Sequence, residues 1–232
     1  MTARYALYLA PPPESFLWSF GSRVIGYDAA TGEDLCAPDL SGFDAETWRD
    51  LTAEPRRYGF HGTLKAPFRL ADGLTEPDLI AGVDAFAGGH HAFELAGLEV
   101  AALGSFVALT PGLPLPALTA LADEAVAELD RLRAPLTPAE IARRRPDDLS
   151  ARQRDHLERY GYPYVFEDFR FHMTLTGPLS EDQRPHAVNA LCDAYAVASA
   201  HLPVAIADLC VFRQAEPGGR FRILHRAPLR EA

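Results

Sequence analysis

FHGTLKAPF at residues 60–68 has a near copy, FHMTLTGPL, at residues 171–179. Five of the nine letters agree, and each copy holds one of only eight histidines in the chain. The same offset relates LAGLEV at 95–100 to IADLCV at 206–211. The similarity therefore extends beyond the nonapeptide, and the sequence indicates an internal duplication.

Each copy of the repeat is expected to fold as strand, helix, strand. Helical stretches follow the nonapeptides at about 75–87 and 181–200, and acidic residues suited to a helix N-terminus open both. SFVALTP at 105–111 and RFRILHRAP at 220–228 are typical of the return strands of hairpins. We predict an α+β fold in one domain over residues 1–232, with duplicated β-α-β units and antiparallel sheets that form two pseudo-symmetric lobes around a central cleft.

Residues 134–165 lie between the two repeats and form a predicted helical insertion. Their arginines include Arg143, Arg144, Arg145, Arg152 and Arg154, balanced by the acidic residues Asp147, Asp148, Asp155 and Glu158. Charge runs usually mark solvated faces, which favours an exposed insertion. The alternative is a helical flap that acts as a lid over a site, because the segment ends just ahead of the second motif.

The composition excludes several classes of protein. The chain has 232 residues, of which 48% are hydrophobic, so it can bury a core and is not disordered. No apolar run is long enough to cross a bilayer, and the apolar stretch within residues 1–15 is too short for a secretory signal. Three widely spaced cysteines give neither a disulfide framework nor a cysteine zinc site, which fits the cytoplasm.

The net charge of −10 bears on the partners of the protein. Nonspecific affinity for nucleic acid comes mainly from lysine and arginine, which neutralise phosphates. Long nucleic acid is therefore not an expected partner, and any anionic substrate is expected to be small. The sequence does not indicate an oligomeric state.

The repeated motif separates into a polar face and an apolar face. Side chains on a strand alternate between faces with a period of two. Aromatic and aliphatic residues of one face suit a core, whereas an imidazole and a hydroxyl two positions apart are more easily accommodated on an open face. The residues of this polar face are His61, Thr63 and Lys65 in the first copy, and Arg170, His172, Thr174 and Thr176 in the second.

Two such faces could meet across a cleft if an approximate two-fold axis relates the repeats. An imidazole has an unperturbed pKa of about 6.5, so one histidine can accept a proton while the other donates one. In phosphodiester hydrolysis the base would activate water and the acid would protonate the departing alkoxide. The threonine hydroxyls would hold nonbridging phosphate oxygens. Which histidine takes which role stays open, because the motifs are nearly equivalent.

HGTL at 61–64 and HMTL at 172–175, set in matching units, resemble the paired motifs of the 2H phosphoesterase superfamily. That superfamily includes 2′-5′ RNA ligase-like proteins and cyclic phosphodiesterases. More closely, RYALYLAP at 4–11, RRYGFHGTLKAPF at 56–68 and FRFHMTLTGPL at 169–179 are similar to a bacterial branch associated with phosphonate metabolism. The resemblance covers nearly the whole chain and implies a bilobal fold with the substrate between the lobes.

The resemblance also implies an activity. It implies hydrolysis of a small, cyclic phosphodiester, such as a cyclic ribose phosphate or nucleotide, without a metal or another cofactor. The residues that it implies as catalytic are His61, Thr63, His172 and Thr174.

Further contacts to the substrate are expected beside the motifs. Lys65, Arg170 and Arg57 share parity with the neighbouring histidines and would counter the charge of the substrate. Tyr58 and Tyr5 are candidates to stack on a base or sugar. The candidate substrate-binding residues are Lys65, Arg170, Arg57, Thr176 and Tyr58.

Three alternatives remain open. The first is RNA-end processing, as a 2′,3′-cyclic phosphodiesterase or a 2′-5′ ligase. The second is a catalytically silent protein that binds a nucleotide or sugar phosphate in the same cleft. The third is a metal site, for which Asp168 is the only obvious extra ligand, whereas zinc sites normally gather three or four.

Overall fold

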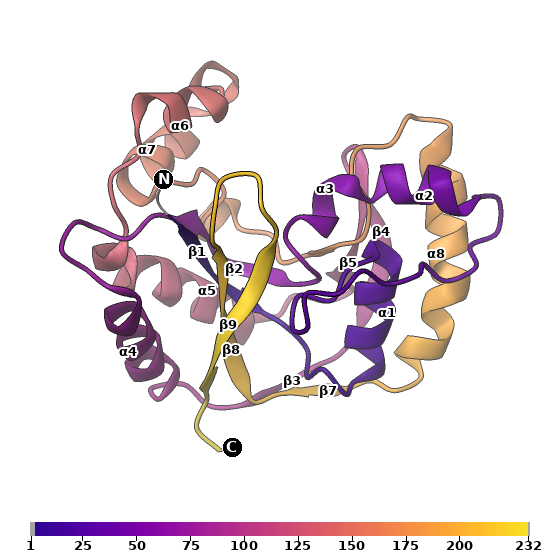
Figure 1. Ribbon diagram of the computed structural model, residues 1–232, viewed down its shortest axis with the longest axis horizontal. Helices are drawn as coiled ribbons and strands as arrows, with labels where there is room; N and C mark the ends of the chain where they lie inside the picture. Colours follow the sequence, from indigo (N-terminus) through magenta and orange to yellow (C-terminus); the bar gives the residue numbers. More distant parts are fainter. Residues whose placement is uncertain (1–2, 232) are drawn as a thin grey trace.

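The computed structural model describes residues 3–231 as a mixed α/β fold (Figure 1). The strands are β1 (Arg4–Leu9), β2 (Gly62–Phe68), β3 (Phe93–Leu95), β4 (Leu98–Leu103), β5 (Phe106–Pro111), β6 (Met173–Thr174), β7 (Val204–Ile206), β8 (Asp208–Gln214) and β9 (Phe221–Pro228). The α-helices are α1 (Phe16–Ile25), α2 (Ala45–Leu51), α3 (Ala53–Arg56), α4 (Glu76–Ala87), α5 (Pro116–Glu128), α6 (Pro138–Arg143), α7 (Ala151–Tyr160) and α8 (Gln183–Ser199). Short 3-10 turns lie at Asp130–Leu132, Pro146–Asp148 and Phe166–Asp168.

A seven-stranded sheet in the order β4-β5-β6-β2-β1-β8-β9 forms the centre of the molecule. Every pair of neighbours in it is antiparallel. β3 and β7 form a separate antiparallel pair. The mixed fold with antiparallel sheets that the sequence predicts is confirmed.

Two strand pairs define an approximate two-fold axis. Gly62 of β2 pairs with Met173 of β6, and Glu94 of β3 pairs with Ala205 of β7. The members of each pair are separated along the chain by the offset of the sequence repeat, so they are equivalent positions. Antiparallel strands that pair at equivalent positions are related by a local two-fold rotation through that pair. The axis therefore passes between the two motif strands.

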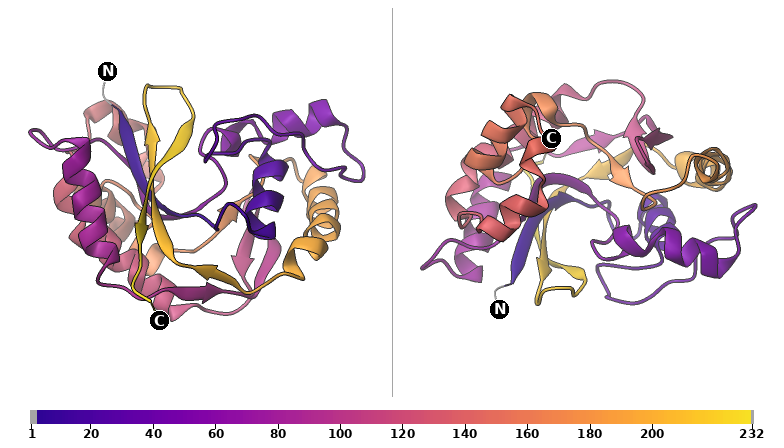
Figure 2. Two further views of the ribbon diagram at one scale, coloured as in Figure 1. Left: turned by 60° about the horizontal axis from the view of Figure 1, so that its bottom comes forward. Right: turned by 90° about the horizontal axis from the view of Figure 1, so that it is seen from above.

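The two halves of the sheet are not the two halves of the sequence. The β4–β5 hairpin of the first repeat pairs with β6 of the second, and the β8–β9 hairpin of the second repeat pairs with β1. In Figure 2 the indigo β1 runs beside the yellow β8–β9 hairpin. We call β2, β1, β8 and β9 half-sheet A, and β4, β5 and β6 half-sheet B. Each half-sheet takes strands from both repeats.

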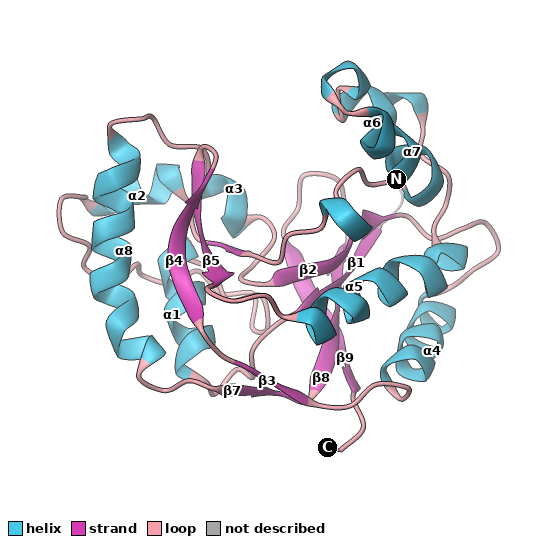
Figure 3. Ribbon diagram, turned by 180° about the vertical axis from the view of Figure 1, so that it is seen from behind, coloured by secondary structure: helices cyan, strands magenta, loops and turns pink. Residues whose placement is uncertain are grey.

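The helices follow the same exchange. α4, from the first repeat, packs against β8 and β9, and α8, from the second repeat, packs against β4 and β5. Figure 3 shows α8 beside β4 and β5, with α4 and α5 on the other side of the molecule. α5 covers β2, the strand of the first motif. The core thus lies between the sheet and these helices, and it includes Leu79 of α4, Leu121 of α5 and Leu191 of α8.

α1 shows how the local sequence sets one of these elements. Ser15 caps its N-terminus by accepting a hydrogen bond from the Trp18 backbone N–H. The helix ends at Gly26, which adopts the left-handed conformation with φ 75°. Leu17, Val24 and other apolar residues of α1 are buried, so the helix is held by its core face.

The predicted insertion contains α6 and α7, which stand above the sheet in Figure 1. Each begins with a capping box, formed by Thr137 and Glu140 in α6 and by Ser150 and Gln153 in α7. α7 ends at Gly161, with φ 74°. Within residues 3–231, no helix combines the length and the apolarity needed to cross a membrane.

Candidate active site

The pairing of β2 with β6 brings the two motifs side by side. The two strands pair at one position, Gly62 with Met173. In an antiparallel register that continues from this pair, His61 lies opposite Thr174 and Thr63 lies opposite His172. Residues directly opposite each other have Cβ atoms about 4.5–5.5 Å apart, and diagonal neighbours about 7–8 Å. The two imidazoles therefore lie on one diagonal and the two hydroxyls on the other. The structure brings together the four residues that the sequence singled out.

The same backbone contact holds each imidazole. Nδ1 of His61 lies 2.7 Å from the carbonyl oxygen of Gly59, and Nδ1 of His172 lies 2.8 Å from that of Arg170. A carbonyl only accepts, so Nδ1 carries the proton in both rings. In a neutral ring, Nε2 is then the nitrogen without a proton. Both histidines present Nε2 for proton transfer.

His61 lies in a more enclosed environment than a surface histidine. Its ring stacks on the buried ring of Tyr8, with centroids 3.6 Å apart and planes 16° from parallel. Burial lowers the pKa of His61 to about 4; the hydrogen bond to Gly59 opposes this shift, and the charge of His172 adds to it. His61 is therefore neutral at pH 7, and its Nε2 can accept a proton.

Two adjoining cavities meet at the motif strands. The His61 cavity has a volume of about 390 Å³ and also touches both motif threonines. The His172 cavity has a volume of about 600 Å³ and also touches Arg170. Thr63, Ala66, Phe106 and Tyr162 border both cavities. A phosphoryl group at Thr63 would thus face both cavities.

Two of the predicted substrate-binding residues lie at these cavities. Arg170 is exposed and borders the His172 cavity. Tyr58 borders the His61 cavity, stacks on Phe221 with ring centroids 5.4 Å apart, and lies 6.5 Å from the His61 ring. Their positions suit contact with a substrate.

The prediction for Lys65 is wrong, because its side chain lies on the opposite face of the sheet. Between the pairings at Thr63 and Lys65, β1 advances by one residue while β2 advances by two. Such a bulge reverses the alternation of side chains. Lys65 is 3% exposed, and its Nζ donates to Asp130 at 3.0 Å and to the Val126 carbonyl at 3.1 Å. Ala66 borders the cavity instead.

Thr176 and Arg57 also differ from their predicted roles. β6 ends two residues before Thr176, whose buried hydroxyl accepts from the Val107 N–H and donates to the Gly177 carbonyl. Thr176 borders the His61 cavity, but its hydroxyl is already satisfied within the protein. Arg57 is exposed, follows α3 rather than lying on a strand, and borders neither cavity.

Tyr5, the other stacking candidate, is on the wrong face. Its hydroxyl donates to Glu76 at 3.0 Å, and its buried ring borders neither cavity. Tyr8, three residues later, is the tyrosine of β1 that reaches the site.

Sequence reasoning missed the aromatic and basic residues that border the His61 cavity away from the motifs. They include Arg4, Tyr8, Arg144 and Tyr162. The last two belong to the insertion, and the Arg144 guanidinium lies 4.9 Å from the Tyr162 ring centroid. Arg152 of the insertion borders the His172 cavity. These positions favour the interpretation of the insertion as a flap over the site. The arginine-rich sequence of the insertion was the available signal.

The acidic residue considered as an extra metal ligand has another partner. Asp168 accepts two hydrogen bonds from Arg152, at 2.8 and 3.0 Å, and one from Gln153 at 3.2 Å. Over the described range 3–231, no group of three or more His, Cys, Asp or Glu side chains is arranged to hold a metal ion.

Comparison with known proteins relates the chain to one family and to longer relatives. A family model described as "Protein of unknown function (DUF1045)" matches residues 63–222. A relative from Janthinobacterium sp. (strain Marseille) is 40% identical over 228 residues, and one from Laribacter hongkongensis (strain HLHK9) is 39% identical over 224. Both are named "Ribose 1,5-bisphosphate phosphokinase PhnN". The matches cover 97% and 95% of this chain but 50% of each relative, so the chain spans about half the length of the curated relatives it matches.

Solved structures similar to the chain include one described as a phosphoesterase and one of E. coli LigT complexed with 3'-AMP. Each is 15% identical to this chain, with a TM-score of 0.44, and each match covers 99% of both chains.

Proposed function

The chain belongs to the DUF1045 family, and from the geometry of its two His-x-Thr pairs we propose that it is a phosphodiesterase that hydrolyses a small phosphodiester. One observation carries the proposal. Around a single paired position on the two-fold axis, His61 and both threonine hydroxyls border one cavity, and His172 borders the adjoining cavity, which Thr63 also lines. Each imidazole is held through Nδ1, which leaves Nε2 as the nitrogen available for proton transfer.

In the proposed reaction His61 is the base and His172 is the acid. His61 is neutral at pH 7, so its Nε2 takes a proton from the attacking water as the oxygen bonds to phosphorus. The bond from phosphorus to the leaving oxygen breaks, and protonated His172 donates the Nε2 proton to that oxygen. The hydroxyls of Thr63 and Thr174 donate hydrogen bonds to the nonbridging oxygens, where negative charge increases in the transition state.

We further propose that the substrate is a cyclic phosphodiester of a ribose phosphate or nucleotide. The protein would act on it in phosphonate metabolism, in the cytoplasm. The name of the two relatives refers to a ribose phosphate, which supports this class. We do not propose the phosphokinase reaction for this chain. Its only lysine, Lys65, does not follow a glycine, so the sequence has no G-x-x-x-x-G-K-[ST] loop to hold the phosphates of ATP.

A panel of cyclic phosphates, incubated with the full chain in EDTA, tests the proposal. We expect a phosphomonoester product, followed by ³¹P NMR, from at least one of 2′,3′-cyclic nucleotides and ribose cyclic phosphates. Binding by calorimetry without product would support the silent binding protein instead. Product that forms only after metal is added would contradict the two-histidine reaction, and selective product from RNA ends would favour RNA-end processing.

Removing either imidazole gives the second test. His61→Ala and His172→Ala should each lower kcat by about 100-fold or more, because each loses a proton-transfer group. His201→Ala is the matched control, since His201 is exposed and stacks on Phe16 away from both cavities. Thermal melts should show that all three variants fold. Unchanged hydrolysis in either motif variant would rule out this mechanism.

A further inference from the structure

The His61 cavity contains a cluster of cationic and phenolic side chains that the two-histidine reaction does not use. Arg4 and Tyr8 come from β1, Tyr58 follows α3, and Arg144 and Tyr162 come from the insertion. The whole chain carries a net charge of −10, whereas the lining of this cavity holds two guanidinium groups and one carboxylate, Glu54, and so has an excess of positive charge. We call these five residues the Arg-Tyr cluster.

Both guanidinium groups retain unused donors. Arg4 donates its Nε to Gln214 at 2.7 Å and lies 5.6 Å from the Phe221 ring centroid. Arg144 is half-buried and lies over the Tyr162 ring. In the part of the chain from residue 3 to 231, no carboxylate forms an ion pair with either arginine. Their charges are therefore available to a ligand.

The Tyr8 hydroxyl belongs to the same cluster. Burial raises the pKa of Tyr8 well above its ordinary value; Tyr58 and Tyr162 raise it further, while the charges of Arg4 and Arg144 oppose the shift. Tyr8 thus keeps its proton and can donate a hydrogen bond. The other four residues are close enough to act electrostatically on its phenol, which shows that the cluster is compact.

We propose that the Arg-Tyr cluster is a second anion subsite, and that the substrate carries a phosphate monoester there in addition to the phosphodiester at the histidines. The inference rests on the proposed function for the position of the scissile group. Two guanidinium groups match the charge and the several acceptor oxygens of a phosphate dianion. A neutral sugar or base would bury these cations without a counter-charge. A volume of about 390 Å³ suits a ligand as small as a sugar phosphate.

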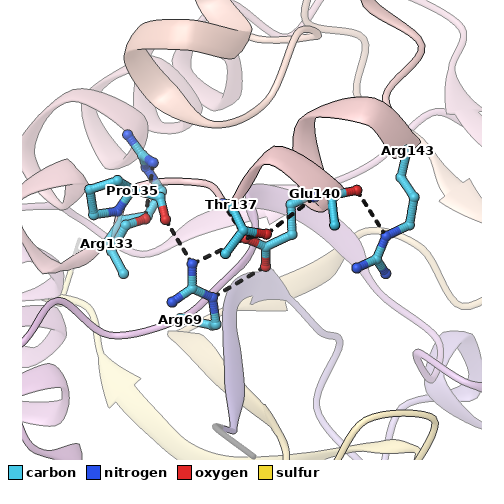
Figure 4. A network of polar contacts seen from close by, with 8 residues as sticks. Arg69, Arg133, Pro135, Thr137, Glu140 and Arg143 are labelled. Carbon is cyan, nitrogen blue, oxygen red and sulfur yellow. Dashed lines mark hydrogen bonds and ion pairs between the residues drawn. The ribbon is translucent and has the colours of Figure 1, made fainter.

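The position of this subsite relative to the catalytic histidines is fixed by the fold. Figure 4 shows Glu140 of α6 held by Arg69, which directly follows β2. Arg69 donates to the two carboxylate oxygens of Glu140 at 3.2 and 3.1 Å, and to the Pro135 carbonyl at 2.7 Å. The Arg69 hydrogen bonds lower the pKa of Glu140 to about 2, so the ion pair persists at neutral pH. α6, which ends next to Arg144, is thereby tied to the strand that carries the first motif.

A matched pair of ligands tests the subsite by calorimetry. Adenosine 2′,5′-bisphosphate and adenosine 2′-monophosphate differ by one phosphate monoester. We expect the wild-type chain to bind the bisphosphate about 10- to 100-fold more tightly, as for charge-assisted hydrogen bonds. Arg144→Gln and Arg4→Gln should each remove most of this preference and leave the affinity for the monophosphate nearly unchanged. Equal wild-type affinities would overturn the subsite.

Arg143→Gln is the matched control for charge and location. Arg143 precedes Arg144 but is exposed and borders neither cavity, so its loss should leave the preference intact. A loss of preference as large as in Arg144→Gln would show a general charge effect and contradict the subsite. Thermal melts of the three variants identify any variant that does not fold, and the Arg4 and Arg144 variants test the subsite independently.

Turnover separates this inference from the proposed function. Adenosine 2′,3′-cyclic phosphate with a 5′-phosphate should have the higher kcat/KM, and Arg144→Gln should remove that advantage through KM. Equal turnover of the substrates with and without the 5′-phosphate, together with equal binding, would overturn the subsite and leave the phosphodiesterase standing. Selective binding of the bisphosphate without turnover of any cyclic phosphate would support the subsite and contradict the proposed function.

Discussion

At the residue scale, two nearly identical motifs place their imidazoles in different surroundings. His61 stacks on Tyr8 and borders the smaller cavity, whereas His172 lies beside Phe106, with ring centroids 5.6 Å apart, and borders the larger one. Proton-transfer roles in a site follow from such differences in environment. The motif sequences alone left the roles of base and acid undecided, and the packing of Tyr8 against His61 is the reason we propose His61 as the base.

The acidic limb of the pH–rate profile tests the state of His61. Its folded pKa of about 4 lies below the unperturbed value of about 6.5, so protonation should abolish the base only near pH 4. We expect kcat/KM, which reports the free enzyme, to fall on the acid side near pH 4. An acid limb near pH 6.5 would contradict the assignment of His61 as a base with a lowered pKa.

The same shift has a consequence for stability. The folded state binds fewer protons than the unfolded state between about pH 6.5 and 4. The stabilisation from neutral His61 is thus present above pH 6.5 and is lost as the pH falls through about 4. Unfolding in urea at several pH values should show this slope, and His61→Ala should reduce it.

Lys65 gives a third prediction at this scale. Lys65→Met should leave kcat/KM nearly unchanged, because the side chain lies away from both His-x-Thr pairs. The melting temperature should fall, since Asp130 loses one cationic partner and keeps only Arg133. Steady-state kinetics and a thermal melt measure the two effects. A large loss of activity in a folded variant would restore the role that its parity predicted.

Strand parity placed His61, Thr63, His172 and Thr174 on one face of the sheet, and it failed at Lys65 because of a bulge. The sequence of one strand shows which side chains alternate, but a bulge depends on how the neighbouring strand advances. β1 ends at Leu9 and β2 begins at Gly62, so no local pattern near Lys65 signals the bulge. The backbone contact of Arg170 with His172 likewise follows from the folded loop and not from residue type.

At the element scale, the junction of β2 and β6 depends on the glycine of the first motif. Gly62 stands where the second motif has Met173, and these equivalent residues pair with each other. A Cβ at Gly62 would overlap the ring of Phe171. The absence of a side chain in one repeat therefore makes room for an aromatic residue of the other.

Gly62→Ala should destabilise the fold by about 1–3 kcal/mol, because the Phe171 ring must move. Phe171→Leu in the same chain should recover part of that loss. Urea unfolding of the two single variants and the double variant gives the coupling energy. Independent, additive costs would show that the two positions do not interact. Because the junction also aligns the histidines, kcat should fall in Gly62→Ala and recover in the double variant.

The insertion shows the limit of prediction for a whole element. Its charged sequence indicated a helical insertion, and α6 and α7 fall within residues 134–165. Charge composition cannot tell a solvated helix from one that closes a cavity, because both expose polar faces. The contacts that hold the insertion in place come from arginines outside residues 134–165. Arg69 donates to Glu140, and Arg133 donates to the Arg159 carbonyl.

At the scale of the whole molecule, the duplication was visible in the sequence but the exchange of hairpins was not. The constant spacing of the repeated segments predicts two equivalent units, and the pairs at Gly62 and Glu94 agree with it. Partner choice among strands is a long-range property, since hairpins β4–β5 and β8–β9 have local patterns that suit either half-sheet. A prediction from the repeats therefore finds the axis and misses which strands lie on each side of it.

This exchange predicts that the repeats cannot fold separately. A fragment of residues 1–136 contains β1 to β5 but lacks the β6 that joins β5 to β2, and it leaves the edge of β1 without β8. The fragment of residues 137–232 retains the β8–β9 hairpin, and an isolated two-stranded hairpin is marginally stable at best. We expect neither fragment alone to show a cooperative thermal transition by circular dichroism. Cooperative unfolding of either isolated fragment would show that the repeats are independent units. Mixing the two fragments should restore a transition and phosphodiesterase turnover, because each half-sheet then regains strands from both repeats.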